Sequence, residues 1–123
     1  MDRAQVERWV RGYERAWSSN DPQDIGALFT EDAKYRFHPY DEPLLGREAI
    51  VSQWIENKDE PEDYAFRFEV AGIDGDLAFV RGVTDYLTDP RRVYSNLWEI
   101  RLTADGTAAD FTEWFMQQPD AAT

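Results

Sequence analysis

The chain has 123 residues, which suits one domain and is too short for two of ordinary size. Apolar residues make up 42% of it, and five Trp, six Tyr and seven Phe residues can build a folded core despite 31% charged residues. The formal net charge of −12 disfavours binding to nucleic acids and to anionic membrane surfaces, so neither is expected as a partner.

The first predicted helix begins at Asp2, which forms a capping box with Gln5, and it ends at residues 18–20. Apolar residues recur along it at the spacing of one helix face: Val6, Trp9, Val10, Tyr13 and Trp17. Asp21 and Pro22 predict the start of a second helix. The buried face of this second helix is expected to consist of Ile25, Leu28 and Phe29. A third helix is expected around residues 49–55.

Strands dominate the rest of the chain. Residues 35–38 alternate in polarity and predict a strand that Pro39 stops. The acidic segment 56–63 is expected to be a solvated loop. Four further strands are predicted over 64–70, 76–87, 93–103 and 108–116, with Asp-Gly hairpin turns at 74–75 and 105–106. The tail, 117–123, is expected to fray.

Helices followed by strands predict an α+β fold in a single domain spanning 1–123, with an ordered core over about 3–117. Strands of this length on a short chain must curl. The expected architecture is therefore a cone: a curved antiparallel sheet with three N-terminal helices packed on its concave face. A cone of this kind encloses a hollow end that can hold a ligand.

The order of three segments, NDPQDIGALFTEDAKYRF, EPLLGREAI and DGTAADFTEWF, resembles the nuclear transport factor 2-like (cystatin-like) superfamily and its SnoaL-like group. The resemblance covers about residues 6–115 and includes ketosteroid isomerase, polyketide cyclases and limonene epoxide hydrolase. It implies a pocket for a small, apolar or oxygenated organic ligand, and an activity among isomerases, cyclases and hydrolases. The alternative is a non-catalytic dimeric module that binds a ligand or a protein. The fold leaves open whether the protein is an enzyme.

By similarity to ketosteroid isomerase, Tyr13 stands where that family places a tyrosine that donates to an oxyanion. Phe37 stands where the general-base aspartate is expected, and Trp98 stands where the second oxyanion donor, a protonated aspartate, is expected, so two of the three catalytic groups are missing. Phenylalanine has no lone pair with which to take a proton, so steroid isomerisation by that route is not expected.

Limonene epoxide hydrolase suggests a different set of catalytic residues, namely Arg81, Asp85 and Glu113. The register carried over from the family turns Arg81, Val83 and Asp85 toward the cavity, where an arginine between two carboxylates could share acid and base work. A shift of one residue would turn the charged side chains of this strand to solvent instead, and its other face carries no charge. Both orientations remain open at this point.

The expected ligand-binding residues are mostly aromatic, with packing in the core as their alternative role: Tyr13, Trp17, Phe37, Trp54, Phe68, Asn96, Trp98 and Phe111. His38 is the only histidine, and strand alternation places it opposite Tyr35 and Phe37, away from the pocket. One histidine without a partner motif is weak support for zinc, and no cysteine is present, so no metal site is predicted. Nucleotide-binding glycine motifs are also lacking, so no cofactor is predicted. The charged N-terminus favours a cytoplasmic location.

The outer face of the sheet is predicted to form a homodimer. Its expected apolar centre comprises Val80, Thr84, Tyr86, Leu97 and Trp114, and its charged rim comprises Arg67, Glu69, Glu99 and Arg101. An apolar centre inside a charged rim is typical of an interface that a two-fold axis brings against itself. The alternative is a monomer in which residues 117–123 cover this face.

Overall fold

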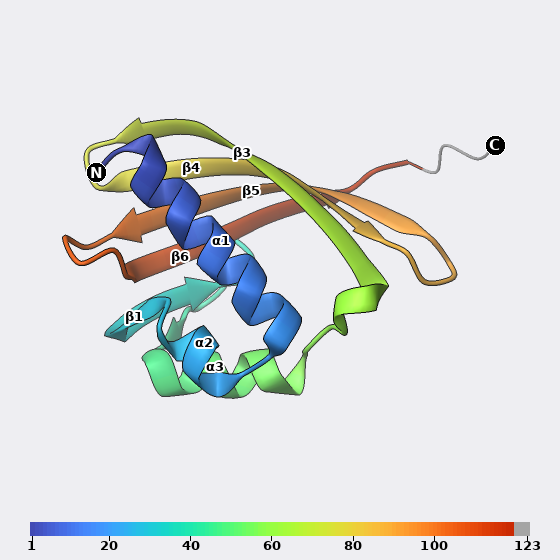
Figure 1. Ribbon diagram of the computed structural model, residues 1–123, viewed down its shortest axis with the longest axis horizontal. Helices are drawn as coiled ribbons and strands as arrows, with labels where there is room; N and C mark the ends of the chain where they lie inside the picture. Colours follow the sequence, from blue (N-terminus) through green and yellow to red (C-terminus); the bar gives the residue numbers. More distant parts are fainter. Residues whose placement is uncertain (120–123) are drawn as a thin grey trace.

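Three helices lie across the concave face of one curved six-stranded sheet (Figure 1). The computed structural model describes residues 1–119. The helices are α1 (Arg3–Ser19), α2 (Pro22–Gly26) and α3 (Arg47–Glu56), with a 3-10 turn at Pro61–Asp63. The strands are β1 (Phe29–Arg36), β2 (Leu44–Leu45), β3 (Tyr64–Asp74), β4 (Leu77–Tyr86), β5 (Arg92–Leu102) and β6 (Ala108–Gln117). The predicted α+β class and helix count are confirmed. The tail 117–123 was expected to fray, but Gln117 ends β6 and the Gln118 amide donates to the Val93 carbonyl at 2.8 Å; residues 120–123 lie outside the described residues.

Helix α1 forms as its sequence predicts. The capping box is present, because Asp2 Oδ1 accepts from the Gln5 amide at 2.9 Å while Gln5 Oε1 accepts from the Asp2 amide at 2.9 Å. The helix ends at Asn20, whose φ of 52° lies in the left-handed region that Asn tolerates better than most residues. The predicted apolar stripe faces the sheet, so α1 brings Tyr13 and Trp17 onto its concave side.

The sheet order is β2-β1-β6-β5-β4-β3, so the last strand of the chain lies inside the sheet. Strands β3 to β6 form an antiparallel meander, whereas β1 pairs with β6 in parallel. The expected sheet was antiparallel throughout, and this one pairing differs. Side-chain alternation is the same in parallel and antiparallel strands, so it could not reveal the direction of β1.

Strand β1 begins six residues earlier than predicted, at Phe29, and α2 is correspondingly shorter. Two tertiary contacts hold this backbone away from a helix. Trp9 Nε1 donates to the Leu28 carbonyl at 2.9 Å, and the Arg47 guanidinium donates to the Phe29 carbonyl at 3.0 and 3.1 Å. Leu28 and Phe29 are buried as expected, but neither belongs to α2. Leu28 lies in the turn after the helix, and Phe29 is the first residue of β1.

Gly82 in the middle of β4 allows an aromatic ring to lie flat across the concave face. A Cβ atom at this position would stand 2.7 Å from the Phe66 ring, closer than real contacts allow. The Phe66 ring in turn stacks on Trp98, with centroids 5.2 Å apart and planes at 14°. The glycine therefore helps to place Trp98 at the centre of the fold.

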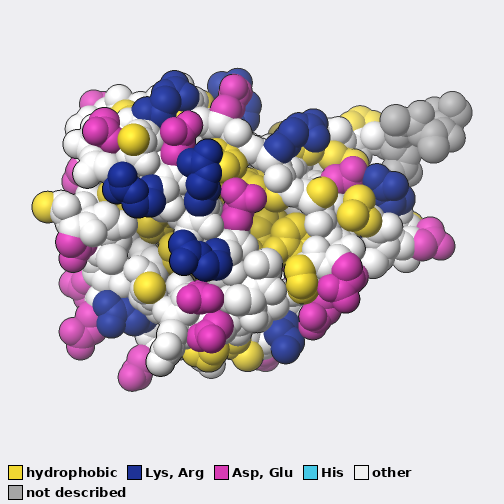
Figure 2. Space-filling model, in the orientation of Figure 1, with side chains coloured by type: hydrophobic (Ala, Val, Ile, Leu, Met, Phe, Trp, Pro, Cys, Tyr) yellow, Lys and Arg dark blue, Asp and Glu magenta, His cyan; other side chains and the backbone are white. Residues whose placement is uncertain are grey.

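The surface on the helix side is not uniformly acidic. Figure 2 shows Lys and Arg side chains over the region of α1, and the exposed cations of this helix are Arg3, Arg8, Arg11 and Arg15. The excess of acidic residues is concentrated elsewhere, as in the segment 56–63. None of the helices in residues 1–119 combines the length and apolar character needed to cross a membrane.

Candidate functional site

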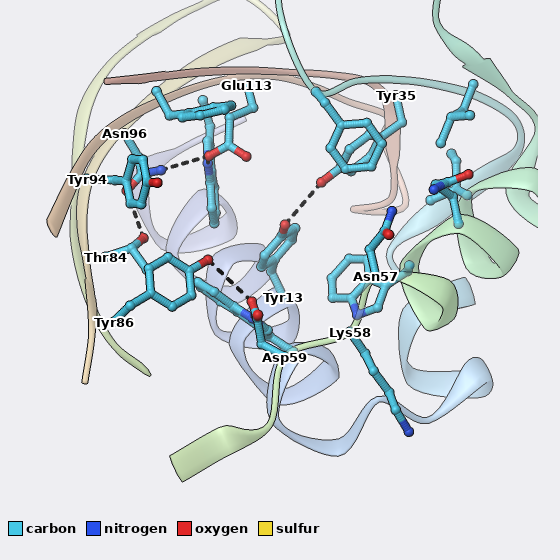
Figure 3. Close-up of a pocket in the computed structure, with 18 of the residues that line it drawn as sticks. Tyr13, Tyr35, Asn57, Lys58, Asp59, Thr84, Tyr86, Tyr94, Asn96 and Glu113 are labelled. Atoms are coloured by element: carbon cyan, nitrogen blue, oxygen red, sulfur yellow. Dashed lines mark hydrogen bonds between the residues drawn. The ribbon is translucent and has the colours of Figure 1, made fainter. Parts of the chain in front are cut away.

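A cavity of about 390 Å³ opens between the concave face of the sheet and helices α1 and α3 (Figure 3). Strands β4, β5 and β6 supply one wall, and the segment after α3 forms part of the rim. The polar and charged lining residues are Tyr13, Tyr35, Gln53, Asn57, Lys58, Asp59, Thr84, Tyr86, Arg92, Tyr94, Asn96 and Glu113. The remaining lining is apolar, with Trp17, Phe37, Leu44, Ile50, Trp54, Trp98 and Phe115.

Glu113 of β6 is the acidic residue on the sheet wall of this cavity. Its Oε2 accepts from Trp98 Nε1 at 2.9 Å and from Asn96 Nδ2 at 2.8 Å. Its Oε1 has no hydrogen-bond partner among the described residues. Burial raises the pKa of this carboxyl group above its ordinary value, while the bonds from Trp98 and Asn96 and the nearby His38 act in the opposite direction. Glu113 therefore offers one fixed and one available oxygen.

Asn96 is held in place from the other side by Thr84. The Thr84 hydroxyl donates to Asn96 Oδ1 at 2.8 Å, which leaves the Asn96 amide group to donate to Glu113. Thr84 is 3% exposed, and Asn96 lies opposite Gly82 in the β4–β5 register. The three side chains form one chain of hydrogen bonds across strands β4, β5 and β6 (Figure 3). This chain restricts the orientation of the carboxylate.

Two tyrosine hydroxyls face each other elsewhere in the same cavity. Tyr13 of α1 and Tyr35 of β1 lie 3.2 Å apart, oxygen to oxygen (Figure 3). Burial, followed by neighbouring negative charge, raises the pKa of Tyr13 well above its ordinary value, and burial and the charge on Glu113 raise the pKa of Tyr35. Both phenols are therefore neutral at physiological pH. One donates to the other, so one proton of the pair is free to reach a ligand.

Stacked rings fix the position of the tyrosine pair. Phe111 is fully buried, and its ring stacks on Tyr35 at 4.6 Å and on Tyr13 at 5.7 Å between centroids. Trp54 and Trp98 contact Tyr13 from two further directions, at 4.8 and 4.5 Å. Since large rigid rings keep few rotamers, this packing pre-organises the two hydroxyls.

The rim of the cavity is tied together by Asp59. Its Oδ2 accepts from Trp17 Nε1 at 3.2 Å and from the Tyr86 hydroxyl at 3.3 Å. The Asp59 carbonyl accepts from Asn20 at 2.8 Å. The predicted acidic loop is therefore anchored at one residue to both α1 and β4, and this contact was not anticipated from the sequence.

Six of the eight predicted ligand-binding residues lie in the cavity lining: Tyr13, Trp17, Phe37, Trp54, Asn96 and Trp98. Phe111 lies beneath the lining as part of the core. Phe68 is half-buried outside the lining, and the Arg11 guanidinium lies 6.0 Å from its ring centroid. Their ligand-binding roles stay predictions.

The predicted orientation of Arg81 and Asp85 is wrong, because the register of β4 places both on the convex face. Arg81 pairs with Glu69 at 3.0 Å, and Asp85 pairs with Arg91 at 2.9 Å.

The register between β4 and β5 shows which face each residue occupies. Arg81 is directly opposite Leu97 on β5, whereas Val80 is opposite Trp98. Directly opposite residues share a face, so the uncharged set that includes Val80 and Thr84 belongs with Trp98 and Glu113. Val83, next to Thr84, also turns away from the cavity.

His38 lies outside the cavity lining, as expected, but it follows the end of β1 at Arg36, so strand alternation is not the reason. Its Nδ1 lies 2.7 Å from Asp41 Oδ2, and its ring stacks on Tyr40 with centroids 5.3 Å apart. Within residues 1–119, no group of three or more His, Asp or Glu side chains is placed to hold a metal ion.

Sequence reasoning missed Tyr35, Thr84 and Tyr86 as lining residues. Tyr86 and Thr84 were missed because the face of β4 was inverted. Tyr35 lies two residues before Phe37 in the predicted strand 35–38, and Phe37 was expected in the lining, so alternation could have identified Tyr35 even though β1 ends at Arg36.

The SnoaL-like domain family matches residues 6–117, nearly the whole chain. This chain belongs to that family. Its fold is shared with a ketosteroid isomerase-like protein from Erwinia carotovora atroseptica, at 21% identity, coverage of 95% of this chain and 97% of that chain, and a TM-score of 0.67. A second similar structure is the epoxide hydrolase/cyclase-like enzyme SalBIII of pyran ring formation in salinomycin. Its identity to this chain is 19%, the match covers 94% of this chain and 93% of that chain, and the TM-score is 0.72.

A third similar structure is an LEH-like epoxide hydrolase from M. tuberculosis, at 15% identity, coverage of 92% and 84%, and a TM-score of 0.69. No curated protein sequence matches the chain. At these identities the three structures show a shared fold, and their different activities mean that the fold alone does not fix the function.

Proposed function

We propose that this protein is an acid–base enzyme that acts on a small, largely apolar organic molecule carrying an oxygen group. The observation that carries the proposal is the Glu113 carboxylate in an aromatic cavity. Trp98 and Asn96 fix its Oε2, and no side chain of residues 1–119 bonds to its Oε1. Isomerases, cyclases and hydrolases all need a group that takes a proton from carbon, a hydroxyl or water. Glu113 fills that role.

The environment of Glu113 suits a general base. Burial raises its pKa from the ordinary value toward neutral pH, which makes the carboxylate a stronger proton acceptor. The hydrogen bonds from Asn96 and Trp98 oppose this shift and keep the charged form accessible. No arginine or lysine pairs with Glu113 in the described residues, so its charge is not neutralised by a salt bridge.

The Tyr13–Tyr35 pair supplies the complementary group. A neutral phenol in a cavity of low polarity stabilises an oxygen on which negative charge develops. The ketosteroid isomerase-like and epoxide hydrolase-like relatives support a chemistry in which charge appears on a carbonyl or epoxide oxygen. The base in this proposal is on β6, so it does not require the aspartate that Phe37 replaces.

Deuterium exchange tests this proposal without knowledge of the natural ligand. The probe is 2-tetralone, an apolar bicyclic ketone, in D₂O with NMR detection. Glu113 takes a proton from the carbon beside the carbonyl, and the C–H electron pair moves into an enolate whose oxygen accepts from a tyrosine. The reverse step returns a deuteron from solvent. We expect Glu113→Gln to lower the protein-catalysed exchange by about 100-fold or more.

The matched control is Glu99→Gln, because Glu99 also accepts from an indole N–H but lies on the convex face. This control should exchange at the wild-type rate. Equal exchange by wild type and Glu113→Gln would overturn the proposal. Binding of 2-tetralone without exchange would favour the alternative of a non-catalytic ligand-binding module.

We also propose a homodimer through the convex face, with a smaller apolar centre than the sequence suggested. Leu97 and Trp114 are opposite each other on that face, and Trp114 is 46% exposed. Val80, Thr84 and Tyr86 lie on the concave face and drop out of the centre. Sedimentation of wild type and Leu97→Glu tests this. A wild type that is monomeric at micromolar concentration, or a dimer unaffected by the substitution, would contradict it.

A further inference from the structure

Arg92 is a cation at the entrance of the cavity. It is the first residue of β5, its side chain is exposed, and it contributes to the lining. The guanidinium carbon lies 5.0 Å from the centre of the Tyr86 ring. A cation over an aromatic face is held in a defined place without being neutralised. The entrance therefore presents an oriented positive charge.

Neighbouring cations differ from Arg92 in what they contact. Arg91 donates to both oxygens of Asp85, at 2.9 and 3.0 Å, on the convex face. Arg92 has no acidic side chain within ion-pair distance in the described part of the chain, although acidic residues outnumber basic ones 25 to 13. Lys58 also contributes to the rim, but its side chain is directed away from the cavity in Figure 3.

The carboxylate of Asp59 at the same rim already accepts hydrogen bonds from other side chains. Its Oδ2 accepts from Trp17 and Tyr86, so it serves to fasten the loop to α1 and β4. Arg92 and Asp59 thus contact opposite parts of Tyr86, the ring face and the hydroxyl. Within residues 1–119 no side chain bonds to the guanidinium N–H groups, which leaves this fork of donors to bind a ligand.

We propose that the ligand carries a carboxylate at the end that stays near the entrance, and that Arg92 recognises it. This inference rests on the proposed function, because it takes the inner end of the ligand to be the oxygen group near Glu113 and the tyrosine pair. The charge of Glu113 repels an anion from the inner end, and Arg92 attracts one at the outer end. The ligand class is therefore an apolar body with an oxygen group at one end and a carboxylate at the other.

A pair of matched probes tests this inference. 2-Naphthol carries the hydroxyl and the apolar rings, and 6-hydroxy-2-naphthoate adds a carboxylate at the far end. Binding is followed by the fluorescence of the cavity tryptophans. We expect wild type to bind 6-hydroxy-2-naphthoate about threefold to fivefold more tightly than 2-naphthol, as suits one exposed ion pair. The preference should shrink as salt is added.

Arg92→Gln should reduce this preference to about one, and Arg91→Gln, the adjacent change of the same charge, should keep it. Equal affinities for the two probes in wild type would overturn the inference. Loss of the preference in Arg91→Gln as much as in Arg92→Gln would also overturn it, because net charge would then be the cause.

If the proposed function is wrong, the exchange experiment fails, and this result differs from the one expected if only the role of Arg92 is wrong. In that case Glu113→Gln exchanges 2-tetralone like wild type, whatever the preference between the two naphthols. If the proposed function holds and the inference fails, exchange still depends on Glu113 while the carboxylate brings no gain in affinity. Absence of binding by both naphthols would count against the inference.

Discussion

Two tryptophan–glutamate pairs lie on opposite faces of the same two strands. On the concave face, Trp98 of β5 donates through Nε1 to Glu113 of β6. On the convex face the order is reversed, and Trp114 of β6 donates to Glu99 of β5. Trp98 is 2% exposed and Trp114 is 46% exposed. The residue types and the bond are the same, and only the surroundings differ.

Enclosure, and not the tryptophan–glutamate pair itself, makes a candidate site. Glu113 receives a second bond from Asn96 and faces a cavity lined by rings. Glu99 lies beside an exposed indole on a face whose other charges, such as Arg81 and Glu69, form ion pairs open to water. Water screens charges on the convex face, while burial strengthens the effect of a charge on the concave face.

The largest expected difference between the two faces is in stability. Trp98→Ala removes a buried ring that packs on Tyr13, Phe66 and Phe111 and should lower the free energy of unfolding by about 3–5 kcal/mol. Trp114→Ala should lower it by less than about 1 kcal/mol, because its ring is already half in water. Urea unfolding followed by circular dichroism measures both. Equal losses of stability in the two variants would contradict the buried role of Trp98 and the exposed role of Trp114.

A smaller effect is expected when Glu113 loses a donor. Asn96→Leu leaves the carboxylate with one hydrogen bond and should cost about 1–3 kcal/mol of stability. The same change should raise the pKa of Glu113, since the lost bond favoured the charged form. NMR titration of the side-chain carboxyl carbon reports the pKa. The control is Ser95→Ala on the convex face, which should leave the pKa of Glu113 where it is.

The stability of the protein is also expected to depend on pH through Glu113. Burial raises the pKa of Glu113 in the folded state above the ordinary value of 4.5, so the folded protein keeps a proton that the unfolded chain releases. Stability contributed by this group is therefore complete below the ordinary value and declines as pH rises through the folded pKa. Its slope is at most about 1.4 kcal/mol per pH unit.

Urea midpoints of wild type and Glu113→Gln, measured from about pH 4 to about pH 8, isolate this group because the other carboxyl groups titrate in both proteins. Wild type should lose stability relative to the variant as pH rises. A constant difference between the two curves would show that the pKa of Glu113 is not raised. The same series on Glu99→Gln provides the convex-face control.

The smallest effects are expected from the charges that the resemblance placed in the cavity. Arg81 and Glu69 are 65% and 63% exposed, so Arg81→Gln should change stability by less than about 0.5 kcal/mol after solvent screening. It should also leave the deuterium exchange of 2-tetralone unchanged. A loss of exchange comparable to that of Glu113→Gln would restore Arg81 to the site and refute the convex placement.

Much of the fold could be predicted because its determinants are local. The capping box at Asp2, the apolar stripe of α1 and the Asp-Gly turns depend on residues within a few positions of each other. The parallel pairing of β1 with β6 joins residues that are more than seventy positions apart in the chain, such as Tyr35 and Phe111. Alternation along either strand is the same whichever strand is its neighbour, so the sequence contains no local sign of this pairing.

The site was predictable in its aromatic residues and in Glu113, but not in the face of β4. Register between β4 and β5 depends on the turn at residues 87–91, and an error of one residue exchanges the two faces. The charge pattern along β4 could have identified the correct face. Val80, Gly82 and Thr84 carry no charge, and a wall that is buried by helices should be the uncharged one.

The position of β6 has a consequence for how the protein is made. This strand is synthesised after the other five strands of the sheet, yet it lies between β1 and β5 in the folded protein. Until it is available, β1 and β2 have no strand that joins them to the β3–β5 meander, and the fold depends on contacts between distant parts of the chain. The complete sheet therefore cannot form until β6 has been synthesised. It then acquires a continuous sheet and its candidate proton-transferring residue, Glu113, in the same step.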